Sequence, residues 1–243
     1  MLSSDVGTVE TSGVGSGAGQ PVSSSARANE SKRRLRDEFL RRLSGLSFLD
    51  LIGKSGSLSD HFFAFVRTHE PLIRGKYIIS FCPFGNEPQI NIEKEGGREP
   101  YRVAYVRVED WAGRRMSARA ARRDTPDLWE VIEPQSGVRI DQPLGSLPEV
   151  VAQDIGIILV PAIAFTREGK RLGRGAGFYD RFLRGFPQAL RLGIAFAEQL
   201  SNSLPEEEWD ERVDIILTDQ EKIPMNSYGD WTKHGKIIHR NQE

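Results

Sequence analysis

The sequence predicts an α/β fold, a single three-layer domain with a mainly parallel sheet flanked by helices. The first observation is that 243 residues, with 38% hydrophobic and 28% charged side chains, suffice for one substantial core. The second is the run at 155–160 (Ile-Gly-Ile-Ile-Leu-Val), which is typical of a strand covered on both faces. The third is that a glycine-rich loop and then a helical stripe follow this strand, an order typical of α/β proteins.

Charge and cysteine content exclude several classes of protein. The formal net charge is −1, so the chain has no general attraction to nucleic acid or to a membrane surface. Cys82 is the one cysteine, which excludes an internal disulfide and suits a reducing compartment. No stretch reaches the roughly eighteen apolar residues of a membrane helix, and residues 1–26 lack the apolar core of a signal peptide. We therefore expect a cytoplasmic protein, of an oligomeric state that the sequence leaves open.

Composition divides the chain into three parts. Residues 1–26 are mostly Ser, Gly, Ala and Val without an aromatic residue, so we expect a disordered tail. The α/β domain is expected over 27–220, followed by a C-terminal extension over 221–243. From Ala28 the pattern is that of an amphipathic helix, with Lys32 and Arg36 four residues apart and therefore on one face.

A second helix and a strand come next. Phenylalanines interleaved with polar residues predict the helix over roughly 59–70. The run at 76–82 (Lys-Tyr-Ile-Ile-Ser-Phe-Cys) predicts a buried strand, and 83–88 (Pro-Phe-Gly-Asn-Glu-Pro) a turn-rich exit from its carboxyl end. Ligands of open α/β sheets bind at the carboxyl ends of strands, so we expect substrate contacts in this loop. Glu87 precedes a proline and is therefore held extended.

The middle region, 95–150, is the least informative. The alternation at 102–108 predicts a strand. A basic stretch at 114–123 follows, with Arg114, Arg115, Arg119, Arg122 and Arg123. We interpret this stretch as the solvated face of a helix, with contact to RNA or phosphate as the alternative.

The glycine-rich loop after Pro161 predicts an anion-binding site. Gly173, Gly175 and Gly177 alternate with other residues, which allows positive φ angles and close approach of a ligand to the backbone N–H groups. Apolar residues after the loop predict a helix whose N-terminus faces the anion: Phe178, Tyr179, Phe182, Leu183 and Phe186. Arg171 and Arg174 add guanidinium groups that match phosphate oxygens. Phosphate is therefore the expected ligand.

Asp180 adds a further inference about this loop. An aspartate beside a phosphate repels it unless a cation lies between them, so its position indicates a nucleotide-bound Mg²⁺. Its alternative role is to complement the dipole of the first helical turn. A dinucleotide-binding fingerprint fits less well, because the glycines come a dozen residues after the strand and no acid ends the next strand, at 191–196.

The last strand is predicted at 213–218, with Asp214 among apolar residues. An unpaired buried carboxylate is costly, so this acid is either satisfied by nearby N–H groups or functional. The histidines show no spacing typical of a metal site or a catalytic triad: His61, His69, His234 and His239.

The residues around the loop resemble the signature of the 5-formyltetrahydrofolate cyclo-ligase family, also called 5,10-methenyltetrahydrofolate synthetases. The matching residues are Val160-Pro161, Phe165, Gly169 and Arg171-Leu-Gly-Arg-Gly-Ala-Gly-Phe-Tyr-Asp180. The resemblance is weaker outside the loop but extends over most of residues 30–220, with matches at Lys32, Arg36, Glu87-Pro88 and Val213-Asp214.

The sequence also departs from the family pattern. Ala162 stands where the family usually has glycine, and Thr166 where it usually has aspartate, so the loop entrance is expected to be stiffer and lacks its local acid. Ala176 replaces a Lys or Gly, and Phe178 replaces the Tyr of many members. These changes bear on phosphate affinity and on substrate choice.

The resemblance implies ATP and Mg²⁺ as cofactors, a reduced folate as substrate and a role for each matching residue. Arg174 would be the catalytic residue. The residues implied in ATP binding are Lys32, Arg36, Arg171, Gly173, Arg174, Gly175, Ala176, Gly177 and Tyr179. Cys82, Glu87 and Phe178 would contact the folate, with Glu87 accepting hydrogen bonds from the pterin ring. Asp180 and Asp214 would hold Mg²⁺. The folate-stacking segment of the family corresponds either to 129–134, which contains Trp129, or to 138–143.

The implied reaction is the ATP-dependent closure of 5-formyltetrahydrofolate to 5,10-methenyltetrahydrofolate through a phosphorylated formyl group, an iminium phosphate. Two alternatives stay open. The basic stretch and the changes at Ala162 and Thr166 fit a catalytically weak member that binds nucleotide or RNA. A sugar-phosphate enzyme on a similar α/β scaffold is the other.

Overall fold

The computed structural model describes residues 24–93, 99–132, 139–225 and 229. It contains three α-helices within these ranges, α1 (Ser24–Ser44), α2 (Phe48–Ile73) and α3 (Phe178–Arg184). The strands of the main sheet are β1 (Tyr77–Ser80), β2 (Arg102–Asp110), β3 (Arg115–Ala120), β6 (Ile155–Pro161), β9 (Leu190–Ile194), β11 (Ile215–Leu217) and β12 (Lys222–Pro224). The smaller sheets are formed by β4 (Trp129–Ile132), β5 (Ile140–Pro143), β7 (Ala164–Thr166), β8 (Arg171–Leu172) and β10 (Leu200–Ser201).

The main sheet is parallel at its centre and antiparallel at both edges. Its order is β12-β11-β9-β6-β1-β2-β3, and the neighbours from β11 to β2 all pair in parallel. The edge strands β12 and β3 pair antiparallel with β11 and β2. This arrangement confirms the predicted α/β class with a mainly parallel sheet.

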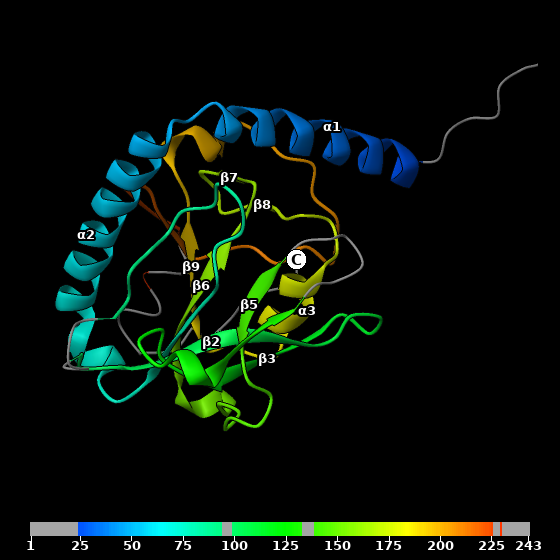
Figure 1. The fold of residues 1–243 in the computed structure, drawn as a ribbon. Coiled ribbons are helices and arrows are strands. Elements are labelled where there is room, and N and C mark those ends of the chain that lie inside the picture. The colour runs from blue at the N-terminus through cyan, green and yellow to red at the C-terminus, as the bar shows by residue number, and fades with distance from the viewer. Residues whose placement is uncertain (1–23, 94–98, 133–138, 226–228, 230–243) are drawn as a thin grey trace, which may run out of the picture.

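Helices cover the two faces of the sheet because its central strands are apolar on both sides. Ile157 and Leu159 of β6 belong to the cluster that contains the buried side chains of α2. Ile158 and Val160 belong to the opposite cluster, with the buried residues of α3. Figure 1 shows α2 along one side of the sheet, α3 on the other and α1 across one end. The three layers are therefore those expected from the pattern at 155–160.

Helix α1 packs on the small sheet β10-β7-β8 rather than on the main one. Phe39 is 2% exposed and contacts a cluster that includes Ile163, Leu172 and Leu204. The helix begins at Ser24, so the last three residues of the predicted tail are helical, while 1–23 lie outside the described residues. Most of the predicted extension 221–243 also lies outside them. The chain contains, within the described ranges, no helix with the length and apolar character needed to cross a membrane.

The second helix is longer than predicted. Its N-cap is Ser47, whose side chain accepts a hydrogen bond from the Asp50 N–H while the Asp50 carboxylate accepts one from the Ser47 N–H. This reciprocal cap stabilises the first turn of the helix. The sequence did not predict that turn, because Gly53 and Gly56 interrupt the helical pattern.

The predicted helix at 114–123 is wrong. Residues 115–120 form β3, an edge strand that pairs antiparallel with β2. Charged residues are common on edge strands because they discourage pairing with a further strand. Arg119 is held by Glu109 of β2 at 2.5 Å, so one arginine of this basic stretch makes a cross-strand ion pair.

The dozen residues between β6 and the glycines form the β7–β8 hairpin, with Gly169 in its turn. Gly169 has a φ of +82°, and a Cβ there would lie 2.5 Å from the carbonyl oxygen of Val213. Only glycine fits this close approach of two backbones. The hairpin belongs to the small sheet β10-β7-β8, and the glycine-rich loop begins directly after β8.

Candidate active site

A cavity of ≈ 890 Å³ lies where the glycine-rich loop, α1 and the carboxyl end of β1 meet. Nearly all of the predicted site residues line it: Lys32, Arg36, Cys82, Glu87, Arg171, Gly173, Arg174, Gly175, Ala176, Gly177, Phe178, Tyr179 and Asp180. The exception is Asp214. The fold thus gathers into one space residues that are up to about 150 positions apart in the sequence.

The glycine-rich loop adopts backbone angles that favour glycine. Gly175 has a φ of +102° and Gly177, the N-cap of α3, a φ of +70°. Arg36 lies across the loop, because its Nε donates a hydrogen bond to the Gly173 carbonyl at 2.8 Å. A Cβ on Gly175 would lie 3.2 Å from the Arg36 Cζ, so a larger residue would displace this guanidinium. The loop and α1 are therefore fitted to each other.

Arg171 and Asp180 neutralise each other on one wall of the cavity. The Arg171 side chain is 4% exposed; it forms an ion pair with Asp180 and donates to the Glu211 carbonyl at 3.3 Å. Asp180 also accepts a hydrogen bond from the Glu211 N–H at 3.1 Å. The two side chains hold the start of α3 against the loop that precedes β11.

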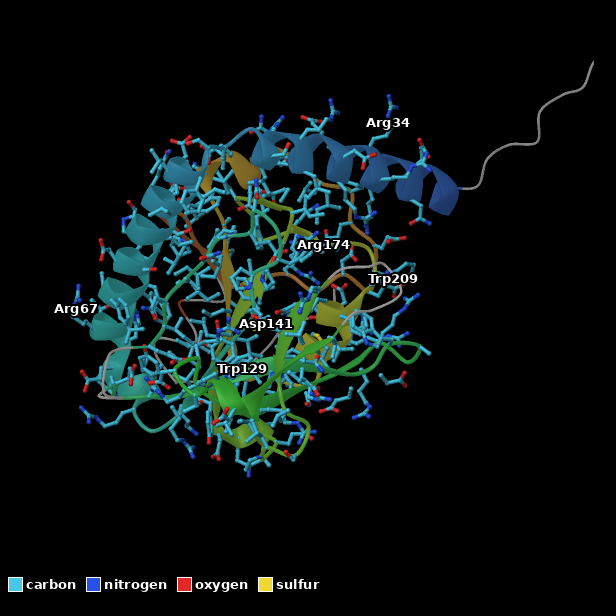
Figure 2. All side chains as sticks on the ribbon, viewed as in Figure 1. Arg34, Arg67, Trp129, Asp141, Arg174 and Trp209 are labelled. Atoms are coloured by element: carbon cyan, nitrogen blue, oxygen red, sulfur yellow. The ribbon has the colours of Figure 1, made fainter. Side chains whose placement is uncertain are left out.

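Arg174 links the glycine-rich loop to the loop that follows β1. Its Nε and Nη2 donate to the Glu87 carboxylate at 2.9 and 2.7 Å, and Nη2 also donates to the Phe84 carbonyl at 3.2 Å. The other Glu87 oxygen accepts from the Phe84 N–H at 2.9 Å. Figure 2 shows Arg174 near the centre of the molecule. The predicted phosphate side and the predicted folate side of the site therefore meet at this pair.

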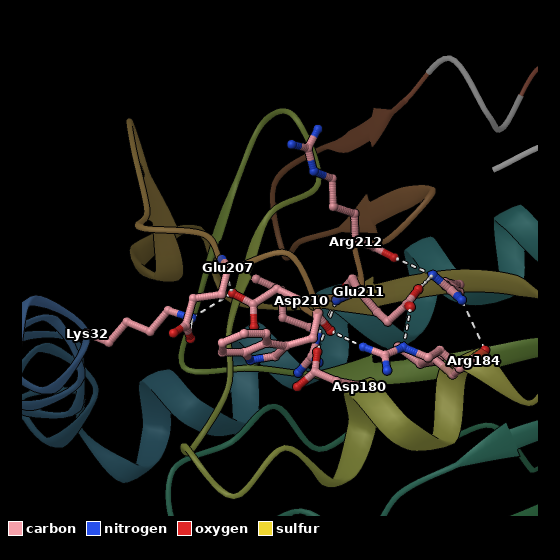
Figure 3. A network of polar contacts seen from close by, with 11 residues as sticks. Lys32, Asp180, Arg184, Glu207, Asp210, Glu211 and Arg212 are labelled. Carbon is pink, nitrogen blue, oxygen red and sulfur yellow. Dashed lines mark hydrogen bonds and ion pairs between the residues drawn. The ribbon is translucent and has the colours of Figure 1, made fainter. Parts of the chain in front are cut away.

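Lys32 reaches the cavity from α1 and binds two acids. Its Nζ lies 2.6 Å from both Glu207 and Asp210, and the side chains of all three are mostly buried (Figure 3). Burial by itself would lower the pKa of Lys32, but the hydrogen bonds that it donates to Asp210 and Glu207 outweigh this effect and raise the pKa. The lysine is therefore charged at neutral pH, and it brings two carboxylates to the cavity wall.

The structure places Asp214 apart from the other predicted site residues. Asp214 is 3% exposed, and its Oδ2 accepts a hydrogen bond from the Arg191 N–H at 2.8 Å. The side chain thus takes the alternative role of a strand acid satisfied by an N–H group. Because it does not line the cavity, Asp180 and Asp214 do not meet around one ion in this structure.

Comparison with known proteins identifies the family. A model of the 5-formyltetrahydrofolate cyclo-ligase family matches residues 28–219. The chain belongs to this family.

Individual relatives agree with the family match. The 5-formyltetrahydrofolate cyclo-ligase of Mus musculus is 26% identical over 197 residues, which cover 78% of this chain and 94% of the relative. That of Mycolicibacterium smegmatis is 29% identical over 62% of this chain and 77% of the relative. The 5,10-methenyltetrahydrofolate synthetase structure from Aquifex aeolicus shares the fold, with a TM-score of 0.63, 24% identity, and coverage of 80% of this chain and 93% of that one.

Of the two segments considered for folate stacking, the structure brings residues of one to the cavity. The two candidate segments contain the paired strands β4 and β5, with Trp129 opposite Pro143, while 133–138 lie outside the described residues. The cavity is lined by Ile140, Asp141 and Gln142 of β5. Trp129 does not line it; its Nε1 donates to the Arg122 carbonyl at 2.8 Å, and its ring packs against Tyr105. Figure 2 shows Trp129 well away from Arg174.

The cavity of this cyclo-ligase family member also contains residues that the sequence did not assign to the site, although Arg114 was noted as part of the basic stretch. Trp111 lies between β2 and β3, is 45% exposed and meets Phe178 edge to face with 5.4 Å between ring centroids. Arg114, Glu207, Trp209 and Asp210 also line the cavity. No local pattern reveals these residues, because each belongs to a loop that only the tertiary fold brings to the glycine-rich segment.

The hydroxyl of Tyr179 is buried within the wall of the cavity. It has no hydrogen-bond partner in the part of the chain that the structure describes. Burial raises the pKa of Tyr179 well above its usual value, so the phenol stays neutral. A buried donor left without a partner is costly and is typical of a site that awaits a ligand or an ordered water.

Cys82 is expected to be an unreactive wall residue. Burial raises the pKa of its thiol to about 12, although Arg123 lies 3.4 Å from Sγ. Because only the thiolate is alkylated, we predict that iodoacetamide at pH 8 modifies the native protein at least about 100-fold more slowly than free cysteine. The unfolded protein in denaturant is the control and should react at the free rate. A native rate equal to that of free cysteine would contradict this assignment.

Proposed function

We propose that this protein catalyses the ATP- and Mg²⁺-dependent cyclisation of 5-formyltetrahydrofolate to 5,10-methenyltetrahydrofolate, with release of ADP and phosphate. The observation that supports it most is the Arg174–Glu87 ion pair, which joins the phosphate-binding loop to the expected folate-binding loop within one cavity. The free thiol of Cys82 suits the reducing cytoplasm, where we place the reaction.

The chemistry explains why a nucleotide is needed. The formyl group on N5 is an amide, so its carbon is a poor electrophile, and attack by N10 would have to expel oxide. Transfer of the γ-phosphoryl group to the formyl oxygen forms an iminium phosphate and ADP. N10 then attacks the formyl carbon, loses its proton, and the C–O bond breaks to release phosphate. Both reacting groups belong to the substrate, so the protein contributes positioning and charge neutralisation.

The nucleotide side of the site is formed by the glycine-rich loop and by α1. Gly173, Gly175 and Gly177 line the cavity together with Lys32 and Arg36, and their backbone N–H groups would bind the phosphates. Arg171 lines the same part of the cavity, where its ion pair with Asp180 holds the guanidinium in place. Such a set of oriented N–H donors and guanidinium groups binds phosphate oxygens well.

The residues also fit a nucleotide-bound magnesium ion. Among the described residues, no cluster of three or more His, Cys, Asp and Glu side chains could hold a metal alone. Mg²⁺ in nucleotide sites needs only one or two carboxylates, because phosphates and water complete its coordination. Asp180 and Asp210 are the acids on this wall that we assign to it, with Glu207 beside them. When bound, the ion would neutralise charge on the phosphates.

The folate side is formed by Glu87 and the apolar wall. A carboxylate can accept two parallel hydrogen bonds from a 2-amino-4-oxo heterocycle, which fixes both its position and its orientation. Phe178 and Cys82 line the same space and would pack against the ring system. Because Arg174 holds Glu87 in the structure, folate binding would free this guanidinium to face the transferring phosphoryl group.

The RNA-binding alternative finds little support in the basic stretch. Arg119 pairs with Glu109, Arg122 contacts Glu99 at 3.3 Å, and Arg123 contacts Asp141 at 3.2 Å. Side chains neutralised in this way offer little net charge to a polyanion.

Spectrophotometric turnover tests the proposal. We expect the absorbance of the methenyl product to rise when 5-formyltetrahydrofolate, ATP and Mg²⁺ are all present, and to stay flat when ATP is omitted or the metal is chelated. A panel of phosphosugars without ATP should show no conversion. Absence of product under the complete conditions would contradict the proposed function, and conversion of a phosphosugar would favour the sugar-phosphate alternative.

A further inference from the structure

One cation of the cavity is left without a partner. Seven basic side chains line the cavity, and six of them are held by a carboxylate or a carbonyl of the protein. The seventh, Arg114, makes no hydrogen bond or ion pair within the described residues. Its five N–H donors are therefore available to a ligand, and an unpaired guanidinium at the rim of a binding cavity suits a planar anion.

The turn that presents Arg114 is rigid and unusual. Arg114 ends the β2–β3 connection with a φ of +53°, a conformation that arginine seldom adopts and that glycine or asparagine adopts readily. The turn is held by α3, because Arg181 Nη1 donates to the Gly113 carbonyl at 2.6 Å. A residue held at a positive φ is often functional, because glycine or asparagine would adopt the same conformation with less strain.

The surroundings of Arg114 indicate which anion it binds. The phosphate-binding side of the cavity already has Lys32, Arg36 and Arg171. Arg114 lies at the other end of the loop, since a Cβ on Gly177 would be 3.8 Å from its Nη1. It shares its turn with Trp111, which is 45% exposed. An exposed aromatic ring beside a free guanidinium matches a ligand in which a benzoyl group is followed by carboxylates.

We infer that Arg114 is a specificity residue that binds a carboxylate at the glutamate end of the folate substrate, with the aminobenzoyl ring against Trp111. The inference rests on the proposed function and deepens it by assigning the substrate's tail. The pterin end is then at Glu87 and the tail at the β2–β3 turn, so the substrate spans the cavity beside the glycine-rich loop.

The test compares two substrates in steady-state assays at saturating Mg-ATP. One is 5-formyltetrahydrofolate, and the other is its analogue with both glutamate carboxylates converted to amides. We expect the wild type to favour the acid by about tenfold in kcat/KM, the effect of one charge-assisted pair near the surface. Arg114→Gly should raise the KM of the acid to that of the amide and leave the KM of ATP within about twofold.

Two measurements separate binding from folding. Glycine adopts a φ of +53° without strain, so the Tm of Arg114→Gly should equal or exceed that of the wild type. Arg115→Ala is the matched control, because it removes the same charge from an exposed neighbour that does not line the cavity. It should keep the wild-type preference for the acid.

The outcomes are distinct. An unchanged preference for the acid in Arg114→Gly would overturn the inference, as would a rise confined to the KM of ATP, which would assign Arg114 to phosphate. If the wild type forms no product, the proposed function fails. The Arg114 assignment is then decided by titrating acid and amide into both proteins and following tryptophan fluorescence. Tighter binding of the acid to the wild type alone supports it, and equal binding overturns it.

Discussion

Replacement of Arg174 by alanine is expected to lower kcat by about 100- to 1,000-fold, the usual effect of removing one preorganised donor from developing charge. KM for ATP and for the folate should change much less, because the other cavity residues still hold both substrates. Arg174 is the side chain that touches both loops of the site, through Glu87 and the Phe84 carbonyl. In the proposed reaction its guanidinium would neutralise charge on the phosphoryl group during transfer.

The stability of this variant should remain close to that of the wild type. The Arg174 side chain is 41% exposed, and an ion pair at such a site contributes less than about 1 kcal/mol. Arg174→Lys keeps the charge without the planar fork and should recover only part of the rate. Arg167→Ala, which breaks an exposed pair with Glu221 outside the cavity, is the control and should retain full kcat. A wild-type kcat in Arg174→Ala would refute the role assigned to this residue.

The second large effect is expected at Lys32. Lys32→Met leaves the Glu207 and Asp210 carboxylates facing each other in a mostly buried position, and should lower the free energy of unfolding by about 3 kcal/mol. It should also raise the KM of ATP at least about tenfold, because two acids then face the phosphates without the lysine. Chemical denaturation and steady-state kinetics measure the two effects.

A second substitution separates them. Adding Asp210→Asn to Lys32→Met removes one unpaired charge, so we expect it to recover part of the stability without restoring the affinity for ATP. Arg33→Met is the matched control on the same helix, since its pair with Glu30 is exposed. If Lys32→Met unfolds at the wild-type denaturant concentration, the ion pairs do not stabilise the docking of α1.

The pH dependence of this stabilisation has a definite sign. The folded-state pKa of Lys32 lies above its ordinary value of 10.5, so the contribution is fully present below that value. It should be lost only as the pH rises through the folded-state pKa. The cost of Lys32→Met should therefore be the same at about pH 7 and about pH 9.

Local patterns predicted the conformation of the glycine-rich loop and the helix that follows it. The order of strand, glycines and helix is contained in adjacent residues, and the positive φ angles at Gly175 and Gly177 follow from that local chemistry. The position of Asp214 could not be predicted from its neighbours in sequence. A buried acid beside a strand signals a special role, but only the sheet register decides whether its carboxylate meets a ligand or, as here, the Arg191 N–H.

Long-range contacts explain why other cavity residues could not be predicted from the sequence. Trp129 was considered for stacking because of its neighbours in sequence, whereas Trp111 reaches the cavity because β2 and β3 form the edge of the main sheet beside α3. Likewise, the ion pairs of Lys32 with Glu207 and Asp210 could not be predicted, because the two acids lie more than 170 residues further along the chain. Such contacts depend on the packing of whole elements rather than on spacing.

The most direct test of the central claim, that this cavity transfers a phosphoryl group to the formyl oxygen, is isotopic. The substrate is prepared with ¹⁸O in the formyl group and converted in ordinary water with Mg-ATP, and the phosphate released is analysed by mass spectrometry. If the formyl oxygen is phosphorylated, each phosphate will contain one ¹⁸O atom. If the label appears in water and the phosphate is unlabelled, the formyl oxygen leaves without phosphorylation and the central claim is wrong.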